Sequence, residues 1–194
     1  TEIEHYMGRV NGLYIEYNNV GDTLKFQSFA DNLPNGIKKV YYTESRIKKT
    51  SHYQNGLLHG LQIKYAENGN KQLAISYYEG KKDGPWTYYF DNQKIARAEE
   101  WKKGIKDGAF KTFSDQDKLI SEQYYKKGEP YGIHKEYYQD GREKHVRIFS
   151  KKGLLEEEYA FDDFGVKEVI KERETKEMKK KKKKAKGKDN SLMN

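Results

Sequence analysis

Residues 80–89 of this 194-residue chain read Gly-Lys-Lys-Asp-Gly-Pro-Trp-Thr-Tyr-Tyr, and a version of this stretch returns at regular intervals along the chain. The second of its two glycines recurs as Gly12, Gly36, Gly60, Gly84, Gly108 and Gly132. The aromatic residue five positions later recurs as Tyr17, Tyr41, Tyr65, Tyr89, Phe113 and Tyr137. Each unit also carries a second aromatic residue, at Phe29, Tyr53, Tyr77, Trp101, Tyr125 or Phe149. A fixed internal period of about 24 residues indicates a repeat protein.

The pattern inside each unit predicts a β-hairpin. The stretch from Leu61 to Tyr65 alternates apolar and polar residues, which is typical of a strand with one face covered. Four of the six repeated glycines follow Asn or Asp, and such pairs favour tight hairpin turns. We therefore expect a turn between strands at each of these junctions, which are Asn11-Gly12, Asn35-Gly36, Asp83-Gly84 and Asp107-Gly108.

Joined in tandem, these hairpins of about 24 residues each predict an all-β fold, an elongated single-sheet meander of about 14 strands. A lone hairpin is marginally stable, so we expect neighbouring units to stack their aromatic residues on one face. The array is predicted to occupy residues 1–165. It begins with a partial unit, continues with units starting at residues 12, 36, 60, 84, 108 and 132, and ends with a degraded unit near residue 156. Residues 166–178 are predicted to form a cap or a helix, in which Val166, Val169 and Ile170 either close the last strand or begin the helix, and 179–194 a disordered lysine-rich tail.

Positive charge is concentrated at the C-terminal end. The formal net charge is +8, of which residues 171–194 carry +7 and the array only +1. Lysine runs bind anionic lipid headgroups or nucleic acid phosphates. The tail has no aromatic residue to stack on bases, so specific nucleic acid binding is not expected. The candidate anion-binding and lipid-binding residues are Lys179, Lys180, Lys181, Lys182, Lys183 and Lys184.

Nothing in the sequence is typical of an enzyme. The chain has no cysteine, which excludes thiolate chemistry and disulfides. It has no phosphate-binding glycine loop and no nucleophile elbow. Its five histidines fall at different places in the repeat, whereas a metal site needs converging ligands. We therefore predict no catalytic residue, no cofactor and no metal site.

Some aromatic residues lie outside the repeated anchor positions, and alternation places many of them on the opposite face of the sheet. They have two explanations. Both faces of a thin sheet need cover, or an exposed aromatic surface contacts a protein partner, because aromatic residues are enriched at interfaces. The candidate partner-binding residues are Trp86, Tyr88, Phe110 and Tyr138, with Trp86 the best single candidate.

The unit Gly-x-x-x-Gly-x-[aromatic or apolar]-x-x-[Tyr/Phe] resembles MORN repeats over residues 1–165. It is most similar to the bacterial variant known as the YwqK family of toxin–antitoxin antitoxins. The closest stretches are residues 80–89 and 124–128. The resemblance implies a β-hairpin array used for protein interaction or, in some MORN proteins, membrane association. It also implies a bacterial protein of the cytoplasm or cell surface.

Three functions remain open from the sequence. The first is a non-enzymatic interaction scaffold that binds a protein partner, for which a YwqK-type antitoxin is the most concrete form. The second is a peripheral membrane module whose basic tail docks on anionic lipid. The third is an exported cell-surface adhesion or host-interaction protein, which a leader upstream of Thr1 would support.

Overall fold

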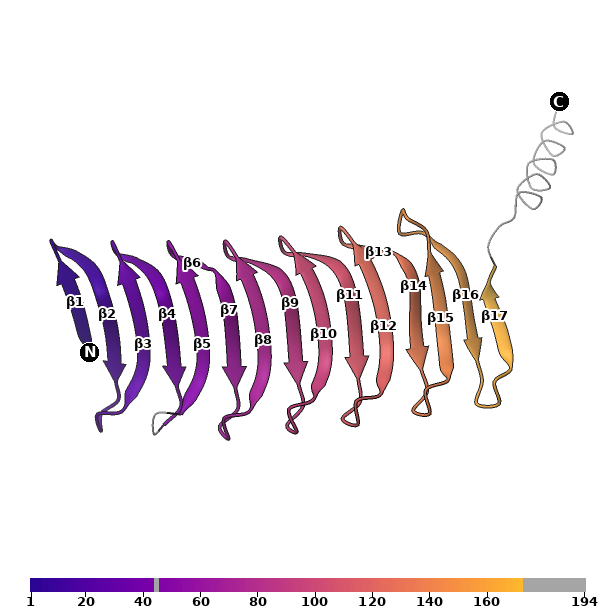
Figure 1. The fold of residues 1–194 in the computed structure, drawn as a ribbon, viewed down its shortest axis with the longest axis horizontal. Coiled ribbons are helices and arrows are strands. Elements are labelled where there is room, and N and C mark those ends of the chain that lie inside the picture. The colour runs from indigo at the N-terminus through magenta and orange to yellow at the C-terminus, as the bar shows by residue number, and fades with distance from the viewer. Residues whose placement is uncertain (44–45, 173–194) are drawn as a thin grey trace, which may run out of the picture.

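The computed structural model describes residues 1–43 and 46–172, and these form one open antiparallel sheet of 17 strands. Strands that follow one another along the chain pair with each other, except that β5 pairs with both β6 and β7, and β12 with both β13 and β14, so the sheet is a meander of tandem hairpins (Figure 1). The predicted all-β single-sheet fold is confirmed. The strands are β1 (Glu2–Tyr6), β2 (Arg9–Tyr17), β3 (Thr23–Ala30), β4 (Leu33–Tyr41), β5 (Ile47–Gln54), β6 (Leu57–Leu58), β7 (Gly60–Tyr65), β8 (Lys71–Tyr78), β9 (Lys81–Tyr89), β10 (Ile95–Lys102), β11 (Ile105–Phe113), β12 (Leu119–Lys126), β13 (Glu129–Pro130), β14 (Gly132–Tyr137), β15 (Glu143–Phe149), β16 (Leu155–Phe161) and β17 (Lys167–Lys171).

The hairpin turns lie one glycine earlier in the repeat than the sequence predicted. At Asn55-Gly56 and Lys103-Gly104 both residues have positive φ, which is the backbone of the two-residue turns that suit the twist of antiparallel strands. The predicted turn glycines lie inside strands instead. Gly84, for example, is part of β9, at a bulge where the register shifts opposite Ser76. The prediction was wrong because a β-bulge requires positive φ just as a hairpin turn does, so the pair Asp-Gly fits either structure.

The Asn or Asp before each bulge glycine connects one unit to the next. Asn11 Oδ1 accepts a hydrogen bond of 2.9 Å from the backbone N–H of Asp31, and Asp83 Oδ2 accepts one of 3.2 Å from Lys103. Where His59 and Tyr131 replace Asn or Asp, the strand is interrupted, which separates β6 from β7 and β13 from β14. The regular spacing of these side chains therefore fixes each turn against the previous unit.

The two repeated aromatic residues of a unit point to opposite faces of the sheet. Tyr17 pairs with Thr23 and Glu16 with Lys25, so Leu24 is an extra residue that reverses the alternation along β3. Phe29 consequently lies on the face opposite Tyr17. The expectation that the two repeated sets of aromatic residues stack on one face was wrong for this reason. We call the face of Tyr17, Tyr41, Tyr65, Tyr89, Phe113 and Tyr137 the anchor face, and the face of Phe29, Tyr53, Tyr77, Trp101, Tyr125 and Phe149 the row face.

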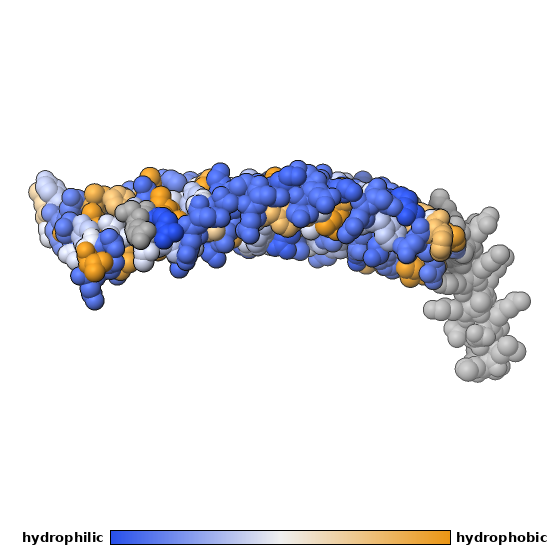
Figure 2. Space-filling model, turned by 90° about the horizontal axis from the view of Figure 1, so that it is seen from below, coloured by the Kyte–Doolittle hydropathy of each residue, from blue (hydrophilic) through white to orange (hydrophobic). Residues whose placement is uncertain are grey.

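A single layer of strands leaves few side chains fully covered. Among the described residues the buried hydrophobic side chains are those of Ile75, Phe110 and Val146. Seen along its strands, the sheet is a thin, gently arched body with a largely hydrophilic visible surface (Figure 2). Most aromatic residues are half-buried. The array is therefore stabilised by packing between side chains of adjacent units.

At the C-terminal end of the array, residues 167–171 form the edge strand β17, which pairs with β16. Of the two structures that the sequence left open for this segment, these residues adopt the closing strand. All five residues of β17 are exposed, and the strand completes the last hairpin through its pairing with β16 alone. The predicted helix beyond residue 172 and the lysine-rich tail lie outside the described residues.

Candidate interaction surface

A continuous row of aromatic rings crosses the row face from β9 to β15. Ring centroids are 5.6 Å apart for Trp86 and Trp101, 5.7 Å for Trp101 and Phe110, and 5.0 Å for Phe110 and Tyr125. The row continues through His134 to Phe149, with centroids 5.5 and 4.6 Å apart. Adjacent strands lie about 4.8 Å apart, so one aromatic residue per strand on the same face necessarily forms a contiguous row.

Two lysines lie over these rings. Lys82 Nζ is 3.4 Å from the ring centroid of Trp86 and 4.4 Å from that of Trp101. Lys106 Nζ is 4.4 Å from the centroid of Tyr125 and 4.9 Å from that of Phe110. Burial lowers the pKa of Lys82, although the Glu99 carboxylate partly opposes this. The surface of the row therefore presents ammonium groups held by cation–π contacts.

The charged groups beneath the row are paired. Glu99 is only 6% exposed, and it accepts a 2.8 Å hydrogen bond from Trp101 Nε1 and forms a 2.8 Å ion pair with Arg97 Nε. The Arg97 guanidinium lies 4.3 Å from the Tyr88 centroid, and Tyr88 stacks on Trp86. Within the described part of the chain, the buried indole N–H of Trp86 has no hydrogen-bond acceptor. An unpaired buried donor is costly, so this N–H lowers the stability of the packed row.

Three of the four predicted partner-binding residues come together on this face. Trp86 and Tyr88 are half-buried neighbours in β9, whereas Phe110 is 8% exposed and forms the base of the row. Tyr138 lies apart from them, in the loop after β14, where its hydroxyl donates a 2.7 Å hydrogen bond to the carbonyl oxygen of Phe161. The predicted anion-binding run Lys179–Lys184 lies outside the described residues.

Sequence reasoning missed Trp101, Lys82 and Lys106 as members of this surface. Trp101 belongs to the second set of repeated aromatic residues, which the repeat pattern predicts for the anchor face. The two lysines occupy the same place in successive units, and this recurrence was the available signal. Their positions over the rings depend on the register between β9 and β10 and on that between β11 and β12.

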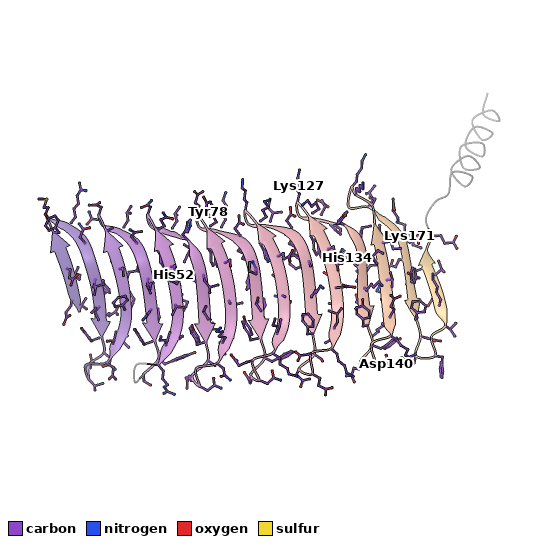
Figure 3. All side chains as sticks on the ribbon, in the orientation of Figure 1. His52, Tyr78, Lys127, His134, Asp140 and Lys171 are labelled. Carbon is purple, nitrogen blue, oxygen red and sulfur yellow. The ribbon has the colours of Figure 1, made fainter. Side chains whose placement is uncertain are left out.

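His134, a member of the aromatic row, makes the stability of the fold depend on pH. Its ring is 5% exposed, and Nε2 lies 2.7 Å from the carbonyl oxygen of Tyr124 (Figure 3). Burial lowers the pKa of His134 below its usual value of 6.5; the Tyr124 carbonyl opposes that shift, and Arg147 on the facing strand adds to it. The unfolded chain therefore binds a proton more readily, and this contribution to stability is lost as the pH falls from 6.5 through the folded-state pKa.

We expect the unfolding midpoint of the protein to fall between about pH 7.5 and 5.5, and to fall less in His134→Gln, which keeps a donor but does not titrate. Denaturant titrations followed by circular dichroism at each pH measure this difference. His5→Gln, in the exposed edge strand β1, is the control and should retain the dependence of the native protein. Identical pH profiles for His134→Gln and the native protein would contradict the assignment.

Two kinds of site are missing from the part of the chain that the structure describes. No three His, Cys, Asp or Glu side chains there gather as metal ligands would. Within residues 1–43 and 46–172, no helix has the length and apolar composition needed to cross a bilayer.

Comparison with known proteins adds little to this description. No protein-family model matches the chain, and neither does any curated protein. Among solved structures, one match is a crystal structure of a GtfA/B complex bound to UDP and GlcNAc, with 12% identity and a TM-score of 0.21. The match covers 70% of this chain and 27% of that one. A similarity of this size supports no inference about function.

Proposed function

We propose that the chain is a non-enzymatic scaffold that binds a protein partner through its row face. The YwqK-type antitoxin is the most concrete form of this function, and it rests on the resemblance of the repeat unit alone. In that form the partner would be a toxin protein held against the sheet.

The observation that supports the proposal most is the lysine-covered aromatic row. Tryptophan and tyrosine are enriched in protein interfaces, where they supply large contact areas at a small entropic cost. Repeat arrays create extended surfaces of this kind because each unit adds the same side chains one step further along. The row from Trp86 to Phe149 also stays on one face over several units, as a partner that lies along the array would require.

Two neighbouring residues on opposite faces test the proposal. A photo-crosslinking amino acid at Tyr88 lies on the row face, and the same amino acid at Tyr89 lies on the anchor face. We expect irradiation in the native host's cells to join position 88, and not position 89, to one reproducible protein, identified by mass spectrometry. Equal products from both positions, or products from position 89 alone, would refute binding through the row face.

The membrane alternative predicts a different result. Binding through the basic tail would leave both crosslinking positions without a protein product, and deletion of residues 173–194 would release the protein from anionic vesicles. A crosslinked partner that persists after this deletion supports the scaffold, because contacts made by the row face do not depend on the charges of the tail.

A further inference from the structure

Four lysines from four neighbouring strands gather on the row face in the N-terminal half of the array. Pairing across the sheet places Lys25, Val40, Lys49 and Lys64 side by side along one line. Lys38 lies in the next line, between Gln27 and Ser51. We call Lys25, Lys38, Lys49 and Lys64 the lysine cluster.

The lysine cluster is electrostatically unfavourable on its own. Lys49 lies directly opposite Lys64, and like charges directly opposite each other on paired strands destabilise a sheet. Burial lowers the pKa of Lys38, and the charges of Lys25 and Lys49 lower it further. The repulsion between these ammonium groups lowers the stability of the fold. A bound anion would compensate for this repulsion.

The protein supplies only one counter-ion to the cluster among the residues that the structure describes. Lys25 Nζ lies 3.0 Å from Glu16 Oε2. Lys38, Lys49 and Lys64 have no carboxylate within 4.0 Å among residues 1–43 and 46–172. Within this part of the chain, three ammonium groups therefore lie together without an internal partner.

We propose that the lysine cluster binds an acidic segment, rich in Asp and Glu, of a protein partner. This inference rests on the proposed function and names the chemistry of the partner. Carboxylates three or four residues apart on a helix are about 5–6 Å apart, close to the spacing of strands about 4.8 Å apart. An acidic helix laid across the strands therefore matches the adjacent pair Lys49 and Lys64, and its next turns reach past Val40 to Lys25 and Lys38. The cluster also lies on the same face as the aromatic row, so one partner can contact both.

Two features favour carboxylates over a nucleic acid or a lipid surface. The ring faces of Trp86 and Trp101 are already covered by Lys82, which removes a platform for stacked bases. The cluster is also narrow, because Glu16 lies at one end of its line and Leu73 at the other. A membrane surface would need a broader basic area.

The test compares three full-length proteins: the native chain, Lys38→Gln/Lys49→Gln/Lys64→Gln, and Lys39→Gln/Lys71→Gln/Lys111→Gln. The first variant, the cluster variant, removes three charges from the lysine cluster. The second, the anchor-face variant, removes three charges from the anchor face. All three proteins keep the basic tail. The probe is a fluorescein-labelled oligoglutamate peptide of about 15 residues, which is long enough to cross the cluster whether it is extended or becomes helical when bound. Fluorescence anisotropy measures its affinity at low salt.

We expect the cluster variant to bind oligoglutamate roughly tenfold more weakly than the anchor-face variant, as three ion pairs of modest strength would give. Its unfolding midpoint should rise above that of the native protein, because the repulsion between Lys49 and Lys64 is removed. This combination of a more stable fold and weaker binding is typical of a binding site and not of a structural one.

Equal losses of affinity in the two variants would overturn the inference, because binding would then follow net charge. Tighter cluster-dependent binding of inorganic polyphosphate, oligodeoxythymidine or phosphatidylserine vesicles than of oligoglutamate would overturn it in favour of phosphate groups. A partner crosslinked at position 88, with no cluster-dependent binding of oligoglutamate, would also overturn it while leaving the proposed function standing.

Discussion

Phe110→Ala is expected to lower the free energy of unfolding by about 3 kcal/mol, the usual cost of removing a buried aromatic side chain from a core. Phe110 is the most buried member of the aromatic row apart from His134, at 8% exposure, and its ring contacts Trp101 on one side and Tyr125 on the other. Removing it leaves a gap that neighbouring strands cannot close, because their spacing is fixed by backbone hydrogen bonds. Urea denaturation followed by circular dichroism measures the loss.

Tyr14→Ala is the matched control for Phe110→Ala. Tyr14 occupies the same place in a unit near the N-terminus, but it is half-buried and its nearest ring, Phe29, is 6.4 Å away. We expect this variant to lose only about 1 kcal/mol. Equal losses at the two positions would contradict the view that the central units are held by neighbours on both sides.

Gly108→Ala is expected to lower the free energy of unfolding by about 2–3 kcal/mol, more than a positive φ alone would explain. Gly108 has a φ of +127°, and a Cβ added there would lie 2.7 Å from Glu100 Cβ. The Glu100 carboxylate accepts a 3.1 Å hydrogen bond from the backbone N–H of Ala109, so the side chain cannot move away without losing this bond. Thermal and urea unfolding measure the combined cost.

Gly132→Ala separates steric crowding from backbone strain. Gly132 is the equivalent glycine of the next unit, with a φ of +71° and no atom within 4 Å of an added Cβ. Its loss should be only about 1 kcal/mol, the cost of the left-handed backbone for an L-residue. If Gly132→Ala destabilised the protein as much as Gly108→Ala, the contact with Glu100 would not be the cause.

The sequence alone determined the architecture of this protein. The fixed period of the repeat and the alternation within each unit predict a meander of β-hairpins, and the structure confirms that sheet. The alternation is local and shows within a single strand, and the repeat period shows in the order of residues along the chain, so neither signal depends on contacts between distant residues. For the same reason, Trp86, Tyr88 and Phe110 could be grouped from their spacing, and the structure places them on one face.

Only the tertiary structure decided which glycine turns the chain and which face each aromatic residue occupies. Asp83-Gly84 fits a turn and a bulge equally well, since both need positive φ, and only pairing with the neighbouring strand distinguishes them. One extra residue at Leu24 reverses the alternation, so Phe29 and Tyr17 lie on opposite faces. The lysine cluster depends on register as well, because Lys49 and Lys64 meet only when β5 and β7 pair in this one alignment.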